Sequence, residues 1–261
     1  MLRAILVIGV VAACASGGEP AASLPGGATR LRVMTYNVNF GIAGDRAGIE
    51  AIRGASPDLV VLQETNEMWE RAIVGALRGR FPHHRFGLPT NEWSAGGMGV
   101  LSRWPIVRVD QLDTAAGPFY AWRIVVDAPG GLLQILDVHL HPPSDRGSWV
   151  VGYFTTRAVR AREARDHLSR LDLTIPTIVA GDFNEEDEGQ AIAVFLAQGF
   201  TNALPRFQPD ANTWAWPVAG TTLRFRLDHI LHDSRFRAMA ADVVAGGRSD
   251  HAPVWADLVR L

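Results

Sequence analysis

Two segments that are apolar on both faces and end in a carboxylate or an amide place the strongest constraint on the fold. DLVVLQE runs from Asp58 to Glu64, and IVAGDFN runs from Ile178 to Asn184. A strand that is apolar on both faces has to be covered on both sides. Because predicted strands outnumber predicted helices and many are neighbours in sequence, we expect mixed or antiparallel sheets covered by helices.

Period-two alternation predicts a strand at the start of the folded domain. In LRVMTYNV, Leu31 and Val33 lie on one face of the strand, and Met34 and Tyr36 lie on the other. Further strands are predicted at residues 99–102, 106–112, 120–127, 132–140, 177–180, 226–231 and 254–259.

Helical spacing of apolar residues predicts a short helix near residues 49–52, a second at 69–77 and one long helix over 154–171. In the long segment arginines alternate with acids, which favours a solvated face over a nucleic-acid-binding stripe. These arginines are Arg160, Arg162, Arg165 and Arg170. The acids at residues 185–188 are interpreted as a solvated loop and a helix start.

The N-terminus has the pattern of an export signal. Arg3 precedes an apolar run over residues 4–13, which is too short for a bilayer that requires about 20 residues. VAAC, which ends at Cys14, is similar to the lipobox of bacterial lipoproteins. We therefore expect a lipoprotein-type signal peptide at 1–13 and an exported protein held on a membrane by lipidated Cys14. The alternative is an ordinary signal peptide that is cleaved elsewhere.

The rest of the chain is predicted to hold one folded domain. Residues 14–30 are small and rich in glycine and proline, which indicates a flexible tether, and the domain spans 31–261 without a second linker. Cys14 is the only cysteine, so no internal disulfide can form. The formal net charge of −2 gives no global basic field toward nucleic acid, although it does not exclude a local patch.

Polar residues stand at or just beyond the ends of several predicted strands, where layered folds gather functional sites. Each of them alone is explained by a turn, a cap or a loop. Their joint occurrence, with carboxylate, amide and imidazole groups all present, favours a site. They are Asn37, Glu64, His139, Asp182, Asn184, Asp228, Asp250 and His251.

The motifs around these residues resemble those of the endonuclease/exonuclease/phosphatase family. TYNV, LQE, VHL, GDFN, LDHIL and SDHAPV occur in the family's order and approximate spacing, from about Leu31 to Leu261. GDFN and SDH are the most specific of them. The resemblance implies an α/β (α+β) four-layer sandwich, with two packed mixed or antiparallel sheets flanked by helices. It also implies a Mg²⁺-dependent phosphoesterase, with Mn²⁺ as an alternative ion.

The resemblance also implies a metal site. Glu64 would be the oxygen ligand of Mg²⁺, which takes few protein carboxylates and keeps several waters. Asn37 would support the site, and Asp250 would contribute from the other side.

The remaining motif residues are implied to carry the hydrolysis. Asp182 would orient and deprotonate the attacking water, and Asn184 would hold the water or the phosphate. His251 and Asp228 are similar to the family's histidine–carboxylate pair, in which the carboxylate fixes the tautomer and raises the basicity. His139 would stabilise the transition state or protonate the leaving group.

His141 is the alternative to His139, because it directly follows the strand predicted at 132–140 and has the same parity as His139, which lies on the polar face. The VHL motif favours His139. Histidine at this position and Asn39 near the first motif both differ from the pattern of abasic-site enzymes, so a dedicated DNA-repair role is not expected.

The expected function is therefore an exported hydrolase of phosphate esters, most simply a phosphodiesterase such as an endonuclease. A sphingomyelinase-like lipid phosphodiesterase and a phosphomonoesterase are the alternatives within this class. The substrate would accordingly be nucleic acid, a phospholipid or a small phosphate ester; no protein partner or oligomeric state is predicted. Trp214 and Trp216 precede the Asp228 strand and would pack, stack on bases or enter a lipid interface; for Trp214 packing is favoured. A non-catalytic binding module of the same fold is the other class, and it is disfavoured because all the motifs are intact.

Overall fold

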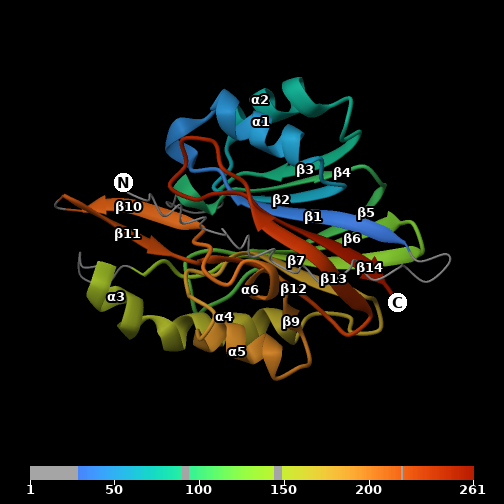
Figure 1. Ribbon diagram of the computed structural model, residues 1–261. Helices are drawn as coiled ribbons and strands as arrows, with labels where there is room; N and C mark the ends of the chain where they lie inside the picture. The colour runs from blue at the N-terminus through green and yellow to red at the C-terminus, as the bar shows by residue number, and fades with distance from the viewer. Residues whose placement is uncertain (1–28, 90–93, 144–148, 219) are drawn as a thin grey trace, which may run out of the picture.

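A computed structural model describes residues 29–89, 94–143, 149–218 and 220–261, with the side chains of 149 and 150 left out. Two six-stranded sheets pack face to face, with helices on both outer surfaces (Figure 1). The predicted four-layer α/β sandwich is therefore confirmed. The predicted signal peptide, Cys14 and most of the tether lie outside the described residues. No helix in the described part of the chain combines the length and the apolar character of a membrane span.

Each sheet has one parallel pair of strands at its centre. In the first sheet the order is β13-β14-β1-β2-β4-β3, and β1 is parallel to β2. In the second sheet the order is β5-β6-β7-β8-β12-β9, and β7 is parallel to β8. All other pairs are antiparallel. The strands of the first sheet are β1 (Arg30–Asn37), β2 (Leu59–Gln63), β3 (His83–Gly87), β4 (Met98–Ser102), β13 (Phe236–Val243) and β14 (Val254–Arg260). Those of the second are β5 (Ile106–Leu112), β6 (Ala121–Ala128), β7 (Gly131–His139), β8 (Thr177–Asp182), β9 (Thr201–Asn202) and β12 (Asp228–His232).

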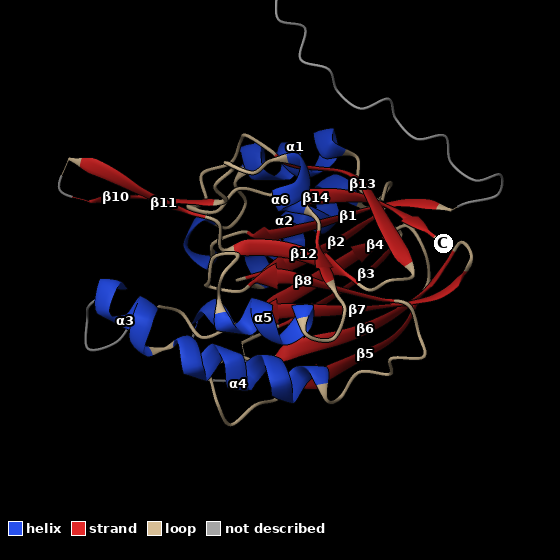
Figure 2. Cartoon of the chain, turned by 60° about the horizontal axis from the view of Figure 1, so that its bottom comes forward, coloured by secondary structure: helices blue, strands red, loops and turns tan. Residues whose placement is uncertain are grey.

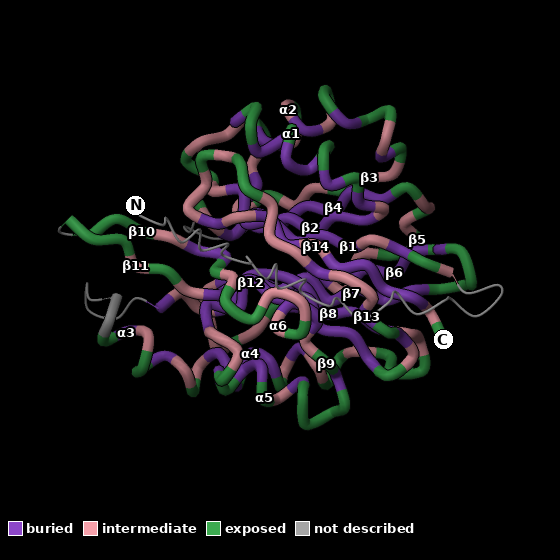
Figure 3. The backbone as a smooth tube through the Cα atoms, in the orientation of Figure 1, coloured by how far each residue is buried: buried purple, intermediate pink, exposed green. Residues whose placement is uncertain are grey.

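The core between the sheets follows from strand alternation. Leu31 and Val33 of β1 lie in the cluster that fills the space between the sheets. Met34 and Tyr36 of the same strand lie in the cluster beneath the outer helices. The alternation predicted for this segment and the two-sided burial predicted for β2 are confirmed, and the interior of both sheets is buried (Figure 3).

Helices cover both outer faces (Figure 1). The first sheet is covered by α1 (Arg46–Ala55) and α2 (Glu67–Leu77), whose apolar stripes include Ile52, Trp69 and Ile73. The second sheet is covered by α4 (Arg157–Leu168) and α5 (Gln190–Leu196). Short pieces complete the chain: η1 (Phe40–Ile42), η2 (Ser94–Gly96), α3 (Trp149–Thr155) and α6 (Leu204–Phe207). A two-stranded hairpin of β10 (Trp214–Val218) and β11 (Thr221–Phe225) projects from the body on the same side as α3 (Figures 1 and 2).

The prediction of one long helix over 154–171 is wrong. The segment forms α3 and α4, which are separated at Thr156, and Leu171 lies beyond the end of α4. The Thr156 hydroxyl donates to the carbonyl of Gly152 at 2.5 Å and accepts from Arg160 at 2.6 Å. Phe154, which was expected in the apolar stripe, is 64% exposed.

The prediction that the arginines and the acids nearby are solvated is wrong for three of them. Arg160, Glu163 and Glu185 are completely buried, and Arg160 Nε lies 3.0 Å from Glu185 Oε1. The burial arises because α4 packs onto the loops that follow β7 and β8.

Candidate active site at one edge of the sandwich

The central parallel pairs bring the predicted residues to one edge of the sandwich. Asn37 ends β1 and Glu64 follows β2, while His139 ends β7 and Asp182 ends β8. The antiparallel neighbours β12 and β14 begin at this edge, and they bring Asp228 and the preceding pair Asp250-His251 to it. All eight predicted residues therefore meet there, as the strand-end pattern leads one to expect.

Asp182 lies at the centre of this edge. In the register of the second sheet it stands between His139 on β7 and Asp228 on β12. Its Oδ1 accepts from the backbone N–H of Asn184 at 2.9 Å, and its Oδ2 accepts from Asn37 Nδ2 at 3.1 Å. Burial raises the pKa of Asp182, and the nearby histidines only partly oppose this effect. A carboxylate with a raised pKa is suited to take a proton at neutral pH.

His251 is held against two carboxylates. Its Nδ1 lies 2.9 Å from Asp228 Oδ2, and its Nε2 lies 3.6 Å from Asp182 Oδ2. Because an ionised carboxylate only accepts hydrogen bonds, Nδ1 carries a proton. Burial lowers the pKa of His251, but the charges of Asp228 and Asp182 outweigh burial and raise the pKa to about 10. The ring is therefore an imidazolium at neutral pH.

Thr213 completes this pair and was not predicted as a site residue. Its hydroxyl donates to Asp228 Oδ2 at 2.6 Å and accepts from the backbone N–H of Asp228 at 3.0 Å. It precedes Trp214, whose indole N–H donates to Asp250 Oδ2 at 2.9 Å. Trp214 is buried, so the packing expected for it is confirmed. The Thr-Trp pair therefore supports two residues of the site.

His139 reaches Asp182 from the opposite side. Its Nε2 lies 3.6 Å from Asp182 Oδ2, the oxygen that His251 also faces. Burial lowers the pKa of His139, although Asp182 opposes this, so the ring is neutral at neutral pH. Phe119 stacks on the imidazole with ring centroids 4.2 Å apart, a contact that no sequence motif indicated. The ring of His141 instead contacts the carbonyl of Pro142 at 2.7 Å, and it forms no ion pair with Asp182 in the described structure.

Glu64 is connected to this centre through Asn37. Asn37 Nδ2 donates to Glu64 Oε1 at 3.0 Å as well as to Asp182. Glu64 Oε2 accepts from the N–H of Phe40 at 3.2 Å, and burial raises the pKa of Glu64. Asp250 is held from its other side by Asn39 Nδ2 at 2.9 Å.

Backbone strain is concentrated at this edge. Four described non-glycine residues have a positive φ, and three of them belong to the site: Asn39 at 59°, Glu64 at 59° and Asn184 at 52°. The left-handed region disfavours side chains, and such outliers cluster where surrounding contacts hold functional groups. Asn184 is held by its Nδ2, which donates to the carbonyl of Leu140 at 2.9 Å.

The donor set fits a divalent cation. Within the described residues, neither Glu64 nor Asp182 nor Asp250 forms an ion pair with an arginine. Burial raises the pKa of the first two, so a nearby positive charge would stabilise their ionised forms. Carboxylate and amide oxygens are the ligands that Mg²⁺ and Mn²⁺ prefer.

A second group of potential metal ligands lies nearby and shares Asp182 with the first. One potential ligand atom each of Asp182, Asp228 and His251 lie within 4.8 Å of one another. Asp228 Oδ2 is already taken by the hydroxyl of Thr213 and by the imidazole of His251.

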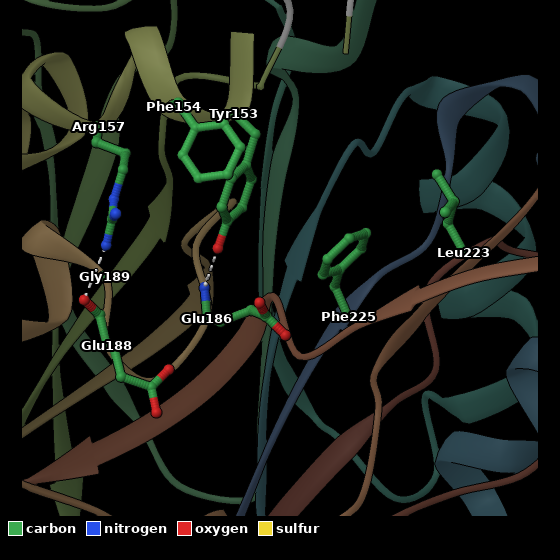
Figure 4. A pocket seen from close by; sticks show the side chains of 8 residues that line it. All are labelled: Tyr153, Phe154, Arg157, Glu186, Glu188, Gly189, Leu223 and Phe225. Atoms are coloured by element: carbon green, nitrogen blue, oxygen red, sulfur yellow. Dashed lines mark hydrogen bonds between the residues drawn. The ribbon is translucent and has the colours of Figure 1, made fainter. Parts of the chain in front are cut away.

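A cavity of about 340 Å³ lies between α3 and β11, beside the loop that follows Asn184 (Figure 4). Glu186 lies at this cavity, and its backbone N–H donates to the hydroxyl of Tyr153 at 3.3 Å. The cavity is lined by Tyr153, Phe154, Arg157, Glu186, Glu188, Gly189, Leu223 and Phe225.

Comparisons with known proteins agree with this architecture. The sequence matches the Endonuclease/Exonuclease/phosphatase family over residues 34–251. The fold is similar to an endonuclease/exonuclease/phosphatase from Beutenbergia cavernae, with a TM-score of 0.70, 22% identity and coverage of 89% of this chain and 72% of that chain. It is also similar to sphingomyelinase C from Streptomyces griseocarneus, with a TM-score of 0.61, 20% identity and coverage of 88% and 99%. The human Nocturnin catalytic domain with bound sulfate gives a TM-score of 0.68, 19% identity and coverage of 89% and 95%. No protein of curated function matches the sequence significantly.

Proposed function

The chain belongs to the endonuclease/exonuclease/phosphatase family, whose members are phosphoesterase hydrolases, and we propose that it is a divalent-metal-dependent phosphodiesterase. The observation that carries the proposal is the convergence of two imidazoles on one carboxylate oxygen. Nε2 of His139 and Nε2 of His251 each lie 3.6 Å from Asp182 Oδ2. The same oxygen is joined through Asn37 to Glu64.

Asp182 acts as the base in the proposed reaction. The oxygen of a water forms a bond to phosphorus, and a proton of that water passes to Asp182 Oδ2. The bond from phosphorus to the leaving oxygen breaks, and the His251 imidazolium supplies the proton that this oxygen needs. His139 and Asn184 confine the reacting groups from the other side.

Glu64 would hold Mg²⁺ or Mn²⁺ together with Asn37 and Asp250. When bound, the cation would neutralise phosphate charge and stabilise the transition state electrostatically. The positive charge of His251 adds to this stabilisation, because Asp228 keeps the ring protonated.

A nuclease and a lipid phosphodiesterase are both consistent with this site, and a specific observation favours considering the lipid enzyme. Trp216 and Val218 on the projecting hairpin are 48% and 41% exposed. Trp216 stacks on Trp214 with ring centroids 6.3 Å apart, and Trp214 contacts Asp250, so the exposed indole is connected to the site through Trp214. An exposed indole beside a catalytic edge suits an interfacial substrate.

The test compares supercoiled plasmid, bis-p-nitrophenyl phosphate and sphingomyelin or phosphatidylcholine vesicles as substrates, each with Mg²⁺, with EDTA and with His251→Ala. We expect turnover of at least one diester that requires both the metal and His251. Plasmid nicking would identify a nuclease. Vesicle hydrolysis that Trp216→Ala lowers, while Leu196→Ala on α5 does not, would identify a lipid enzyme. A folded protein without metal-dependent turnover of any diester would contradict the proposal and favour a binding module.

We further propose that the protein is exported and anchored through lipidated Cys14, as the N-terminal pattern indicates. Cys14→Ser is expected to move the protein from the membrane fraction to the soluble fraction. An unchanged membrane fraction would contradict the anchor.

A further inference from the structure

A buried cluster of ionisable residues between α4 and the loop after β8 contacts both loops that carry the proposed catalytic residues. It consists of Arg160, Glu163 and Glu185, all completely buried. Burying three ionisable groups is costly, and well-packed apolar residues often replace such groups without loss of stability. The hydrogen bonds and the ion pair of this cluster show which part of the molecule it holds in place.

Arg160 and Glu163 together hold the backbone of His141. Glu163 Oε2 accepts from the N–H of His141 at 2.9 Å, and Arg160 Nη1 donates to the carbonyl of His141 at 3.3 Å. Both the N–H and the carbonyl of His141, which lies two residues after His139, are thus held by side chains of α4. Asn184 Nδ2, which donates to the carbonyl of Leu140, holds the residue between them.

Glu185 holds the second loop. It directly follows Asn184, its Oε1 lies 3.0 Å from Arg160 Nε, and its Oε2 accepts from the N–H of Ala191 at 2.7 Å. The loop after Asp182 is therefore fixed between α4 and the start of α5.

Two glycines make room for the carboxylates. A Cβ at Gly117 would lie 1.7 Å from Glu163 Oε1, and a Cβ at Gly189 would lie 2.4 Å from Glu185 Oε2. Gly117 is also two residues before Phe119, which stacks on His139. The Glu163 side chain thus packs against the segment that holds one face of the imidazole.

We propose that Arg160, Glu163 and Glu185 are positioning residues that set the placement of His139 and Asn184 around Asp182. The inference rests on the proposed function of this edge. None of the three contacts the reacting groups; each acts through the backbone of a catalytic loop.

Arg160→Lys is the main test in the full-length protein. Lysine keeps the charge opposite Glu185 but cannot reproduce the two Nη contacts to His141 and Tyr153, the second at 2.7 Å. We expect kcat for bis-p-nitrophenyl phosphate to fall by about 10–100-fold while KM changes by less than about twofold. Glu163→Gln, which is isosteric, should lower kcat in the same direction. Arg165→Ala, on the exposed face of the same helix, should leave both constants unchanged.

Histidine ring NMR signals supply a readout that does not need turnover. In Arg160→Lys and Glu163→Gln we expect the His139 signals to shift, while those of His232, buried at the other end of β12, stay in place. A folded variant pair with kcat within about twofold of wild type and unmoved His139 signals would overturn the proposal. Shifts at both histidines would also overturn it, because they indicate general loosening. If Arg160→Lys does not fold, Glu163→Gln decides. If the wild type hydrolyses no diester, the proposed function fails, and the spectra still decide whether the cluster positions His139.

Discussion

The pKa values of two buried carboxylates toward opposite ends of the sandwich, Asp257 and Asp182, are shifted in opposite directions. Asp257 on β14 lies toward the end away from the site, where Arg32 donates to both of its oxygens at 2.8 Å and Arg30 adds a further contact. Burial raises the pKa of Asp257, but these arginines outweigh burial, and its pKa is lowered. At the catalytic edge, burial raises the pKa of Asp182.

The difference separates carboxylates that stabilise the fold through ion pairs with arginine from carboxylates that have no arginine partner among the described residues and can bind a cation. Asp58, which also lies at the far end, pairs with Arg103 at 2.5 Å. In the described part of the catalytic edge, histidine is the only cationic partner of Asp182, and Glu64 has no ion pair. A carboxylate whose ionised form is destabilised in the folded protein is a poor stabiliser and a good base or metal ligand.

The largest expected effect is on activity at the catalytic edge. Asp182→Asn should lower kcat by roughly 10²–10⁴-fold, because the amide cannot accept the proton of the water. Its raised pKa means that ionised Asp182 opposes folding above the pKa of the unfolded chain, so its removal should cost little stability. We expect the thermal midpoint to stay within about 4 °C of wild type. Most of the activity surviving in Asp182→Asn would show that the base is misassigned.

A bound metal ion should give the carboxylates of the catalytic edge the positive partner that arginines give Asp257 and Asp58 at the far end. Mg²⁺ at 100 times its Kd should stabilise the folded protein by about 2.7 kcal/mol, measured by calorimetry, and Mn²⁺ should act in the same way. Glu64→Gln should remove this stabilisation. Glu67→Gln is the matched control, since Glu67 is an exposed carboxylate three residues further along. Equal stabilisation of wild type and Glu64→Gln would place the cation elsewhere.

Asp257 should show the opposite pattern. Asp257→Asn should cost about 1–3 kcal/mol in urea unfolding at pH 7, because it leaves Arg32 unpaired, while kcat is unchanged. The folded-state pKa of Asp257 is depressed, so its contribution is complete above the unfolded pKa of about 3.9. The contribution is lost as the pH falls below about 4, through the folded pKa, and wild type and variant should converge there. A stability difference that does not shrink as the pH falls from about 5 to about 2 would contradict the linkage.

The site was more predictable than the supports around it. Alternation in β1 and the two-sided apolar segment of β2 predict where these strands are buried. Strands that end in polar residues predict a shared edge, because the carboxyl ends of parallel strands meet. These local patterns, together with the resemblance to the family's motifs, predicted that Asn37 and Asp182, which are distant in sequence, share one site.

The supports depend on tertiary contacts that no local pattern encodes. Arg160 looks like any helix-surface arginine until α4 packs onto the loops after β7 and β8. FRAMAADV, residues 236–243, is rich in helix formers and was not predicted as a strand. It forms β13 because it pairs with β14, and its register shifts between Ala238 and Ala240.

The smallest expected effect tests whether burial or proximity to the site sets the strength of an ion pair. Arg71 Nη2 and Glu67 Oε2 form an ion pair 3.0 Å apart on α2, which begins just after Glu64, yet the two side chains are 74% and 63% exposed. Water screens such a pair, so Arg71→Ala should change the free energy of unfolding by less than about 0.5 kcal/mol and leave kcat unchanged. Urea unfolding at low and high salt measures the effect. If the loss matched that of Asp257→Asn, proximity to the site rather than burial would set the strength of these pairs, and the contrast between the two ends would no longer hold.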